Sequence, residues 1–184
     1  MPDLISKQAK LCYTAAGQVF HDGKLLLVKH RKLGFWLAPG GHLDPEELPH
    51  LGAEREVFEE TGIRARAFDP QPLLPSTTSE YIPSPIISNV HWVCEENYRR
   101  RIRDGEHYEV DPAWGKPCEQ HLGFVYLMKV VEHAELVADD RESTDIGWFT
   151  ENQIDGLETT EDLRRELHYG FSLIAQLQSV PTRG

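Results

Sequence analysis

Glu56, Glu59 and Glu60 are spaced so that their carboxylates could bind one cation together. Residues at i, i+3 and i+4 share one face of an α-helix, so the three side chains would project to the same side. Each like-charge pair at this spacing destabilises a helix by about 0.2–0.5 kcal/mol. Hard divalent cations such as Mg²⁺ or Mn²⁺ prefer oxygen ligands and would remove that repulsion. The spacing therefore predicts a magnesium or manganese site on a helix.

The residues around these glutamates predict where the helix begins and ends. Pro49 suits the first helical position, because its missing N–H would have no helical partner there in any case. Gly62 suits the left-handed position just past the end. Ala53, Val57 and Phe58 fall on the other side of this helix of about three turns, and we expect them to pack against a sheet.

Arg55 and Glu47 are expected to hold the glutamates in place. Arg55 precedes Glu59 by four residues, so its guanidinium can brace the acidic face. Glu47 can reach Arg55 across the loop before the helix, and the Gly40–Gly41 pair predicts a tight turn ahead of that loop. The alternative for the whole set is an acidic helix face exposed to solvent, which is the usual meaning of a run of charges.

The spacing of this stretch fixes more positions than a solvated helix face requires. The stretch resembles the Nudix box, Gly-x5-Glu-x7-Arg-Glu-U-x-Glu-Glu-x-Gly-U, where U is a bulky aliphatic residue. A match at so many positions is far more specific than a lone glycine motif. The matching residues are Gly41, Glu47, Arg55, Glu56, Val57, Glu59, Glu60, Gly62 and Ile63.

The resemblance implies a fold and an activity. The fold would be α/β, the Nudix α/β/α sandwich with a mixed sheet, and residues 1–184 would form a single Nudix hydrolase domain. The activity would be metal-dependent hydrolysis of the diphosphate linkage in a nucleoside diphosphate joined to another moiety: a nucleotide, a nucleotide sugar or a dinucleoside polyphosphate. Glu47 and Arg55 would mainly orient the metal ligands. The groups that would hold Mg²⁺ or Mn²⁺ are the carbonyl of Gly40 and the carboxylates of Glu56, Glu59 and Glu60.

The general base that accepts a proton from the attacking water is the least determined part of this resemblance, because its position varies within the family. Glu59 is the first candidate. Glu142, in the acidic loop 139–145, is the second. The alternative for Glu142 is an ordinary loop carboxylate in solvent.

Residues outside the box are predicted to bind the substrate: Lys29, Arg31, Tyr81, Arg99 and Arg101. Lys29 and Arg31 end a predicted strand just before the box, where they are either phosphate contacts or ordinary surface charges. Tyr81 lies in a predicted loop, with side-chain packing as its alternative. Arg99 and Arg101 belong to the charged segment 95–117, which we predict to be an insertion. Guanidinium groups bind phosphate oxygens through paired hydrogen bonds, but both arginines could instead pair with neighbouring acids.

A second motif could bind zinc. His91, Cys94, Cys118 and His121 form an H-x2-C and a C-x2-H pair, and zinc accepts two Cys and two His ligands in tetrahedral geometry. However, residues i and i+3 of a strand face opposite ways, and both pairs lie on or beside predicted strands. The pattern is therefore consistent with two interpretations, a zinc site or four unrelated side chains.

The composition narrows the class of protein. The net charge of −11 argues against nucleic acid or an acidic membrane as the partner, so we expect a small-molecule nucleoside diphosphate derivative. An odd count of three cysteines fits a reducing compartment better than a disulfide framework. The N-terminus has no signal-peptide pattern, and no apolar run approaches the roughly 20 residues of a membrane span. We therefore predict a cytoplasmic protein.

Hydrophobic patterns and turn signals predict strands at 11–20, 25–28, 64–74, 86–94, 122–131 and 146–149, and helices at 150–156 and 159–177. Asp22 and Gly23 predict a hairpin turn. The last helix carries an apolar stripe for the core or for a homodimer contact. Two other functions of this fold are an isoprenoid diphosphate isomerase and a non-catalytic nucleotide-binding module. The first departs from the strict box and the second typically lacks a box carboxylate, whereas the box here is intact.

Overall fold

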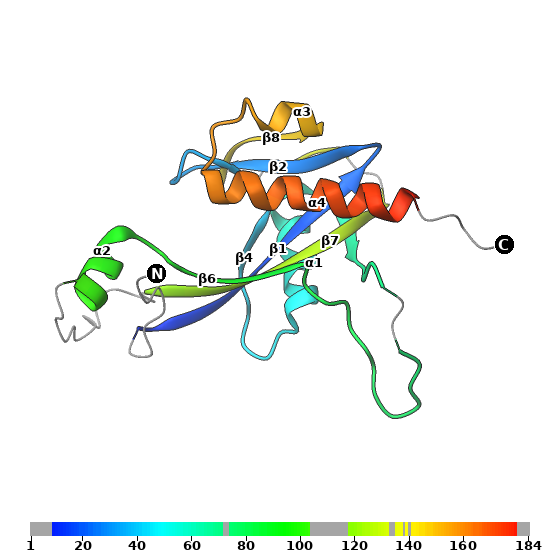
Figure 1. Ribbon diagram of the computed structural model, residues 1–184, viewed down its shortest axis with the longest axis horizontal. Helices are drawn as coiled ribbons and strands as arrows, with labels where there is room; N and C mark the ends of the chain where they lie inside the picture. Colours follow the sequence, from blue (N-terminus) through cyan, green and yellow to red (C-terminus); the bar gives the residue numbers. More distant parts are fainter. Residues whose placement is uncertain are drawn as a thin grey trace.

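The part of the chain that the structure describes forms one mixed sheet with helices on both faces (Figure 1). The computed structural model describes residues 9–71, 74–103, 118–132, 135–137, 139 and 141–179. The strands are β1 (Leu11–His21), β2 (Lys24–His30), β3 (Trp36–Leu37), β4 (Gly40–His42), β5 (Arg64–Ala67), β6 (Ile87–Trp92), β7 (Gln120–Glu132) and β8 (Ser143–Phe149). The helices are α1 (Pro49–Thr61), α2 (Glu95–Tyr98), α3 (Glu151–Ile154) and α4 (Glu161–Ser179), with a π-helical segment η1 at Arg99–Arg103.

The long strands β1 and β7 run parallel through the middle of the sheet. β2 returns antiparallel to β1 through a turn at Asp22 and Gly23, whose φ angles of 47° and 71° are the positive values that such a hairpin needs. β4 pairs antiparallel with β1, β5 and β6 pair with β7, and β3 and β8 pair with β2. The predicted mixed sheet is confirmed.

Helices α1 and α4 cover opposite faces of this sheet. Successive residues of β1 point to opposite faces, so Gly17 and Gln18 show which helix lies on each. Gly17 lies so close beneath α1 that a Cβ atom there would come within 2.7 Å of Val57. On the other face, Gln18 Nε2 donates a 2.9 Å hydrogen bond to the carbonyl of Glu166 in α4. This arrangement is the predicted α/β/α sandwich.

An apolar core fills each side of the sheet. The core beneath α1 consists of Ala15, Val19, Leu26, Ala53, Val57, Ile63, Ala65, Tyr126 and Met128. The core beneath α4 consists of Leu25, Leu27, Ala38, Ile154, Leu167 and Phe171. Leu167 and Phe171 belong to the apolar stripe of α4, so that stripe contacts the protein's own core.

Some elements differ from the predictions. The strand predicted at 64–74 is shorter, since β5 ends at Ala67. The short strands β3 and β4 lie where none was predicted. The segment 95–117 begins with α2 and η1, and its remainder, 104–117, lies outside the described residues. Among the helices that the structure describes, none is long and apolar enough to cross a membrane.

Candidate active site

Helix α1 carries the three glutamates and has the predicted boundaries. It begins at Pro49 and ends at Thr61. Gly62 follows with a φ of 72°, and its N–H donates a 2.8 Å hydrogen bond to the carbonyl of Phe58. A left-handed glycine therefore closes the helix, as the sequence predicted.

The buried face of α1 is narrower than predicted. Ala53 and Val57 are fully buried against the sheet. Phe58 was expected beside them, but 40% of it is exposed. Its ring lies 4.4 Å from the guanidinium of Arg64, which stacks over it just after the helix ends. The prediction for Phe58 is wrong because one residue past Val57 the helix has already turned away from the sheet.

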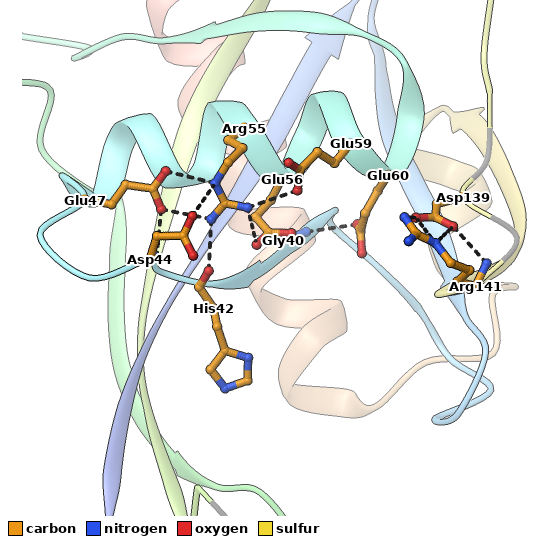
Figure 2. Close-up of polar contacts among 10 residues, drawn as sticks. All are labelled: Gly40, His42, Asp44, Glu47, Arg55, Glu56, Glu59, Glu60, Asp139 and Arg141. Carbon is orange, nitrogen blue, oxygen red and sulfur yellow. Dashed lines mark hydrogen bonds and ion pairs between the residues drawn. The ribbon is translucent and has the colours of Figure 1, made fainter. Parts of the chain in front are cut away.

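Arg55 connects the carboxylates of the loop and of the helix (Figure 2). Its Nε and Nη2 atoms donate to the two carboxylate oxygens of Glu47, each at 2.9 Å. Its Nη1 atom donates to Glu56 at 2.8 Å and to Glu59 at 3.0 Å. Nη2 also donates to the carbonyl of His42 at 3.0 Å. One guanidinium thus fixes three carboxylates and the end of β4, and the contacts predicted for Arg55 are present.

Strand β4 approaches the glutamates so closely that only glycine fits. The N–H of Gly40 donates a 3.1 Å hydrogen bond to Glu60 Oε2. A Cβ atom at Gly41 would lie 2.6 Å from the carboxylate of Glu56, and one at Gly40 would lie 2.6 Å from Ala16. Gly41 therefore allows the backbone to approach the carboxylate of Glu56 closely, and Gly40 allows β4 to lie close against β1.

Burial shifts the pKa values of two of the helix glutamates upward. Burial raises the pKa of Glu60 to about 8, and it outweighs the opposing hydrogen bond from Gly40. Burial also raises the pKa of Glu56, although Arg55 opposes this shift. By contrast, the hydrogen bond from Arg55 holds the pKa of Glu47 below its ordinary value. The site therefore disfavours its own negative charge, and a divalent cation would restore the ionised carboxylates.

The glutamates line a pocket of about 280 Å³ together with residues of the loop before β8. Glu142 belongs to this loop, and its carboxylate is close enough to Glu60 to raise the pKa of Glu60 further. The carbonyl of Glu142 accepts a 2.7 Å hydrogen bond from the N–H of Arg31. The lining residues are Glu56, Glu59, Glu60, Asp139, Arg141 and Glu142.

Asp139 and Arg141 are lining residues that the sequence did not single out. The guanidinium of Arg141 donates to Asp139 and holds the pKa of Asp139 at about 2. The N–H of Asp139 donates a 3.2 Å hydrogen bond to the carbonyl of Glu60, so the loop is fixed to the end of α1. The backbone N–H of Arg141 also donates to the Asp139 side chain, which is an Asx-turn. In the sequence, an Asp two residues before an Arg in this acidic loop is the pattern that could have predicted this ion pair.

The ligand atoms of this pocket suit a hard cation. The groups that face the pocket from α1 are carboxylates, and no sulfur or imidazole lines it within the described residues. Oxygen-only ligand sets favour Mg²⁺ or Mn²⁺ over softer metals.

The predicted substrate-binding residues do not line this pocket. Arg101 donates two hydrogen bonds to Glu119, at 2.7 and 2.9 Å, and the two side chains are 8% and 3% exposed. Arg99 pairs with a glutamate one turn before it in α2. The alternative of pairing with a neighbouring acid at the surface therefore describes Arg99, whereas Arg101 forms a buried ion pair with a distant acid.

The other three candidates also contact protein groups or lie in loops. Lys29 Nζ lies 3.0 Å from Glu158. Arg31 donates to the carbonyl of Ser143, next to Glu142, and so contacts the end of the acidic loop. Tyr81 is 46% exposed in the loop before β6.

The NUDIX domain family model matches residues 13–169, which is most of the chain. The chain belongs to the Nudix hydrolase family. A Nudix-family hydrolase from Clostridium perfringens has a similar structure, with a TM-score of 0.63, 18% identity, and coverage of 88% of this chain and 97% of that chain. This likeness supports the Nudix fold.

Two curated relatives match shorter stretches. A MutT-like protein from Streptomyces ambofaciens is 50% identical over 46 residues, which are 25% of this chain and 30% of the relative. Diphosphoinositol polyphosphate phosphohydrolase 3-beta from Bos taurus is 38% identical over 66 residues, which are 35% of this chain and 38% of the relative. The matched stretch thus spans about a third of the length of these relatives.

Outside the Nudix box, the predicted zinc set is only partly brought together. His91 and His121 are register partners in β6 and β7, with ring centroids 5.3 Å apart. Cys94 is an exposed free cysteine. Cys118 instead forms a disulfide with Cys12, 106 residues away in sequence. This bond differs from the expectation drawn from the odd cysteine count, because the fold brings the start of β1 beside the start of β7.

Proposed function

We propose that the protein is a Mg²⁺- or Mn²⁺-dependent hydrolase that cleaves the diphosphate linkage of a nucleoside diphosphate derivative. The observation that carries the proposal is the convergence of five carboxylates in one pocket, those of Glu56, Glu59, Glu60, Asp139 and Glu142. Such a pocket repels a diphosphate unless a cation lies between the phosphate oxygens and the carboxylates.

In this proposal Glu56, Glu59 and Glu60 hold the cation together with the carbonyl of Gly40. A bound divalent cation neutralises phosphate charge and lowers the pKa of a water molecule. Arg55 acts as a positioning residue, because its donors are already used by box carboxylates and by the carbonyl at the end of β4.

Glu59 and Glu142 are the two candidates for the general base. The Glu59 side chain is 55% exposed, so it can reach a water molecule even though one of its oxygens accepts from Arg55. Glu142 is also exposed, and it approaches the pocket from the loop side. As the water oxygen bonds to phosphorus, one of these carboxylates accepts its proton and the bond from phosphorus to the leaving phosphate oxygen breaks.

The substrate class follows from charge and from the relatives. The net charge of −11 supports a small anionic substrate that arrives with a cation, rather than nucleic acid or a membrane. Nucleotides, nucleotide sugars and dinucleoside polyphosphates form the first panel. A diphosphoinositol polyphosphate belongs in the panel because of the relative named for it. A cytoplasmic location and a homodimer also remain part of the proposal.

The test is cleavage of each panel member with Mg²⁺ or Mn²⁺, read by chromatography of its two phosphorylated products, in the wild type and in three variants. Glu59→Gln and Glu60→Gln keep side-chain volume but remove a metal ligand charge, so kcat/KM should fall by about a hundredfold or more. The matched control is Glu54→Gln, on the same helix, because Glu54 accepts a hydrogen bond from Ala67 N–H at 3.0 Å and does not line the pocket. Its activity should stay near that of the wild type.

Near wild-type turnover by both pocket variants would contradict the metal assignment. A folded protein that binds Mn²⁺ but cleaves no member of the panel would instead be a non-catalytic binding module. Isomerisation of an isoprenoid diphosphate without phosphate release would identify the isomerase.

A further inference from the structure

A second group of metal-ligating side chains lies on the sheet face opposite α1. In β4, Gly41 faces the carboxylate of Glu56, so the next residue, His42, must face the other way. Figure 2 shows the His42 imidazole pointing away from the guanidinium and the carboxylates. His42 pairs with Thr14 of β1, and Cys12, two residues earlier, shares that face.

Three ligand atoms meet at this place. The Sγ atoms of Cys12 and Cys118 and one ring nitrogen of His42 all lie within 4.8 Å of one another. Cys118 Sγ is 3.4 Å from His42 Nε2. A tetrahedral zinc ion, with bonds of about 2.3 Å to sulfur and 2.0–2.1 Å to nitrogen, has a sulfur–nitrogen edge of about 3.6 Å. The spacing of Cys118 and His42 is therefore close to that of two zinc ligands.

His121 lies outside this group of three but next to His42, and it is the candidate for the fourth ligand. It is the register partner of Cys12 in the parallel pair of β1 and β7. Its ring meets that of His42 edge to face, with centroids 4.8 Å apart. Its Nε2 atom is buried and has no hydrogen-bond partner among the described residues. A buried ring nitrogen without a partner is costly, and coordination to a metal would remove that cost.

We propose that Cys12, Cys118, His42 and His121 bind one zinc ion when the disulfide is reduced. Two thiolates and two imidazoles are a preferred ligand set for zinc, whereas the carboxylate pocket suits harder cations. His42 is exposed and both cysteines are half-buried, so the ion can reach the site from solvent. Cys94, which the sequence pattern suggested, is not a ligand.

The oxidised and metal-bound forms exclude each other. A dithiol or phosphine reductant supplies two electrons, the Cys12–Cys118 sulfur–sulfur bond breaks, and each sulfur takes up a proton. Both thiols then lose these protons as their sulfurs bind zinc. The Cα atoms of the two cysteines are 5.7 Å apart, so either form needs only side-chain rotation and a small backbone adjustment.

The experiment titrates the full chain with Co²⁺, which reports thiolate ligands by a charge-transfer band and tetrahedral geometry by strong visible bands. The protein is first reduced with a phosphine and kept in excess Mg²⁺, which occupies the carboxylate pocket. We expect one equivalent of Co²⁺ to give both sets of bands and one equivalent of Zn²⁺ to abolish them. The oxidised protein should give neither.

Variants separate this site from other cysteine chemistry. Cys12→Ser and Cys118→Ser should each lose the charge-transfer intensity of one sulfur and bind Zn²⁺ at least about tenfold more weakly. His121→Ala should show the same loss of Zn²⁺ affinity. The matched control, Cys94→Ser, should titrate like the wild type. An unchanged Zn²⁺ affinity in His121→Ala would refute the assignment of His121 as the fourth ligand.

A measurement on the wild type covers the case in which a cysteine variant fails to fold. Zn²⁺ should protect Cys12 and Cys118 of the reduced protein from alkylation, with Cys94 alkylated at the same rate throughout, as read by mass spectrometry. The absence of thiolate bands from reduced wild type, or equal alkylation of all three cysteines with and without Zn²⁺, would refute the zinc site.

Discussion

In the absence of divalent cations, the stability of the protein should fall as the pH rises, and Glu60 should be the main cause. Burial raises the pKa of Glu60 from an ordinary 4.5 to about 8. Between these two values the folded protein holds a proton that the unfolded chain has released. Since stability rises with pH only where the unfolded state binds more protons, here it must decrease across this window. Below pH 4.5 Glu60 is protonated in both the folded and the unfolded state, so its burial causes no loss of stability. Above about pH 8 it is ionised in both states, and the full cost of burying the charge applies.

The size of the effect follows from the shift. A pKa change from 4.5 to about 8 corresponds to about 5 kcal/mol as an upper limit, because water entering the pocket reduces it when the carboxylate ionises. For a domain of this length, 1 kcal/mol moves Tm by roughly 2–4 °C. We therefore expect Tm of the metal-free protein to drop by at least about 5 °C between pH 5 and pH 8.

The assay is thermal unfolding in chelator at several pH values, for the wild type, Glu60→Gln and Glu54→Gln. The glutamine of Glu60→Gln is neutral at every pH and can still accept the hydrogen bond from Gly40, so the decline should largely disappear. Glu54→Gln removes the same charge from the same helix, away from the pocket, and should keep the decline. Adding Mg²⁺ should stabilise the wild type more at pH 8 than at pH 5, because the cation replaces the proton.

Two results would refute this reasoning. One is a wild-type Tm in chelator that follows the same pH profile as Glu60→Gln. The other is a Mg²⁺ stabilisation that is no larger at pH 8 than at pH 5.

Three further predictions concern two residues that position the pocket carboxylates and one buried ion pair elsewhere in the fold. Arg55→Lys should lower kcat by about 10–100-fold with the fold intact, because an ammonium cannot reproduce the paired hydrogen bonds of the guanidinium. Steady-state hydrolysis measures kcat, and an unchanged value would contradict the prediction. Gly41→Ala should weaken Mn²⁺ binding by at least about tenfold, since its Cβ would lie 2.6 Å from the carboxylate of Glu56 and force that carboxylate to move. Mn²⁺ titration followed by electron paramagnetic resonance would measure this loss. Arg101→Ala should cost about 3–5 kcal/mol because it removes the guanidinium from the buried carboxylate of Glu119, whereas Arg99→Ala on the exposed surface should cost less than about 1 kcal/mol. Denaturant unfolding compares the two variants, and equal costs would argue against the importance of the buried pair.

Local chemistry made the site helix predictable. Pro49 and Gly62 bound α1 because their backbone preferences act within one or two residues, independent of the rest of the fold. The contact between Arg55 and Glu59 is equally local, one helical turn apart. These short-range predictions agree with the structure.

Tertiary contacts decided the features that the sequence did not predict. Strand β4 contains two glycines, which have low strand propensity, and it forms because β1 offers an edge to pair with. Arg101 appeared in a run of charges typical of a surface, yet its partner Glu119 lies 18 residues later and both are buried. Cys12 and Cys118 meet across 106 residues, so no local pattern could pair them.

The pleat of β4 explains how the two proposed metal sites, with unlike ligands, can lie so close together. Gly41 presents the backbone to the hard carboxylates of α1, and the next residue, His42, presents an imidazole to the sulfurs on the opposite face. The carbonyl of His42 accepts a hydrogen bond from Arg55, which also holds Glu56. Any change that moves β4 therefore acts on both faces at once. The sheet itself keeps the two ligand sets apart, because a side chain on one face of a strand cannot reach the other.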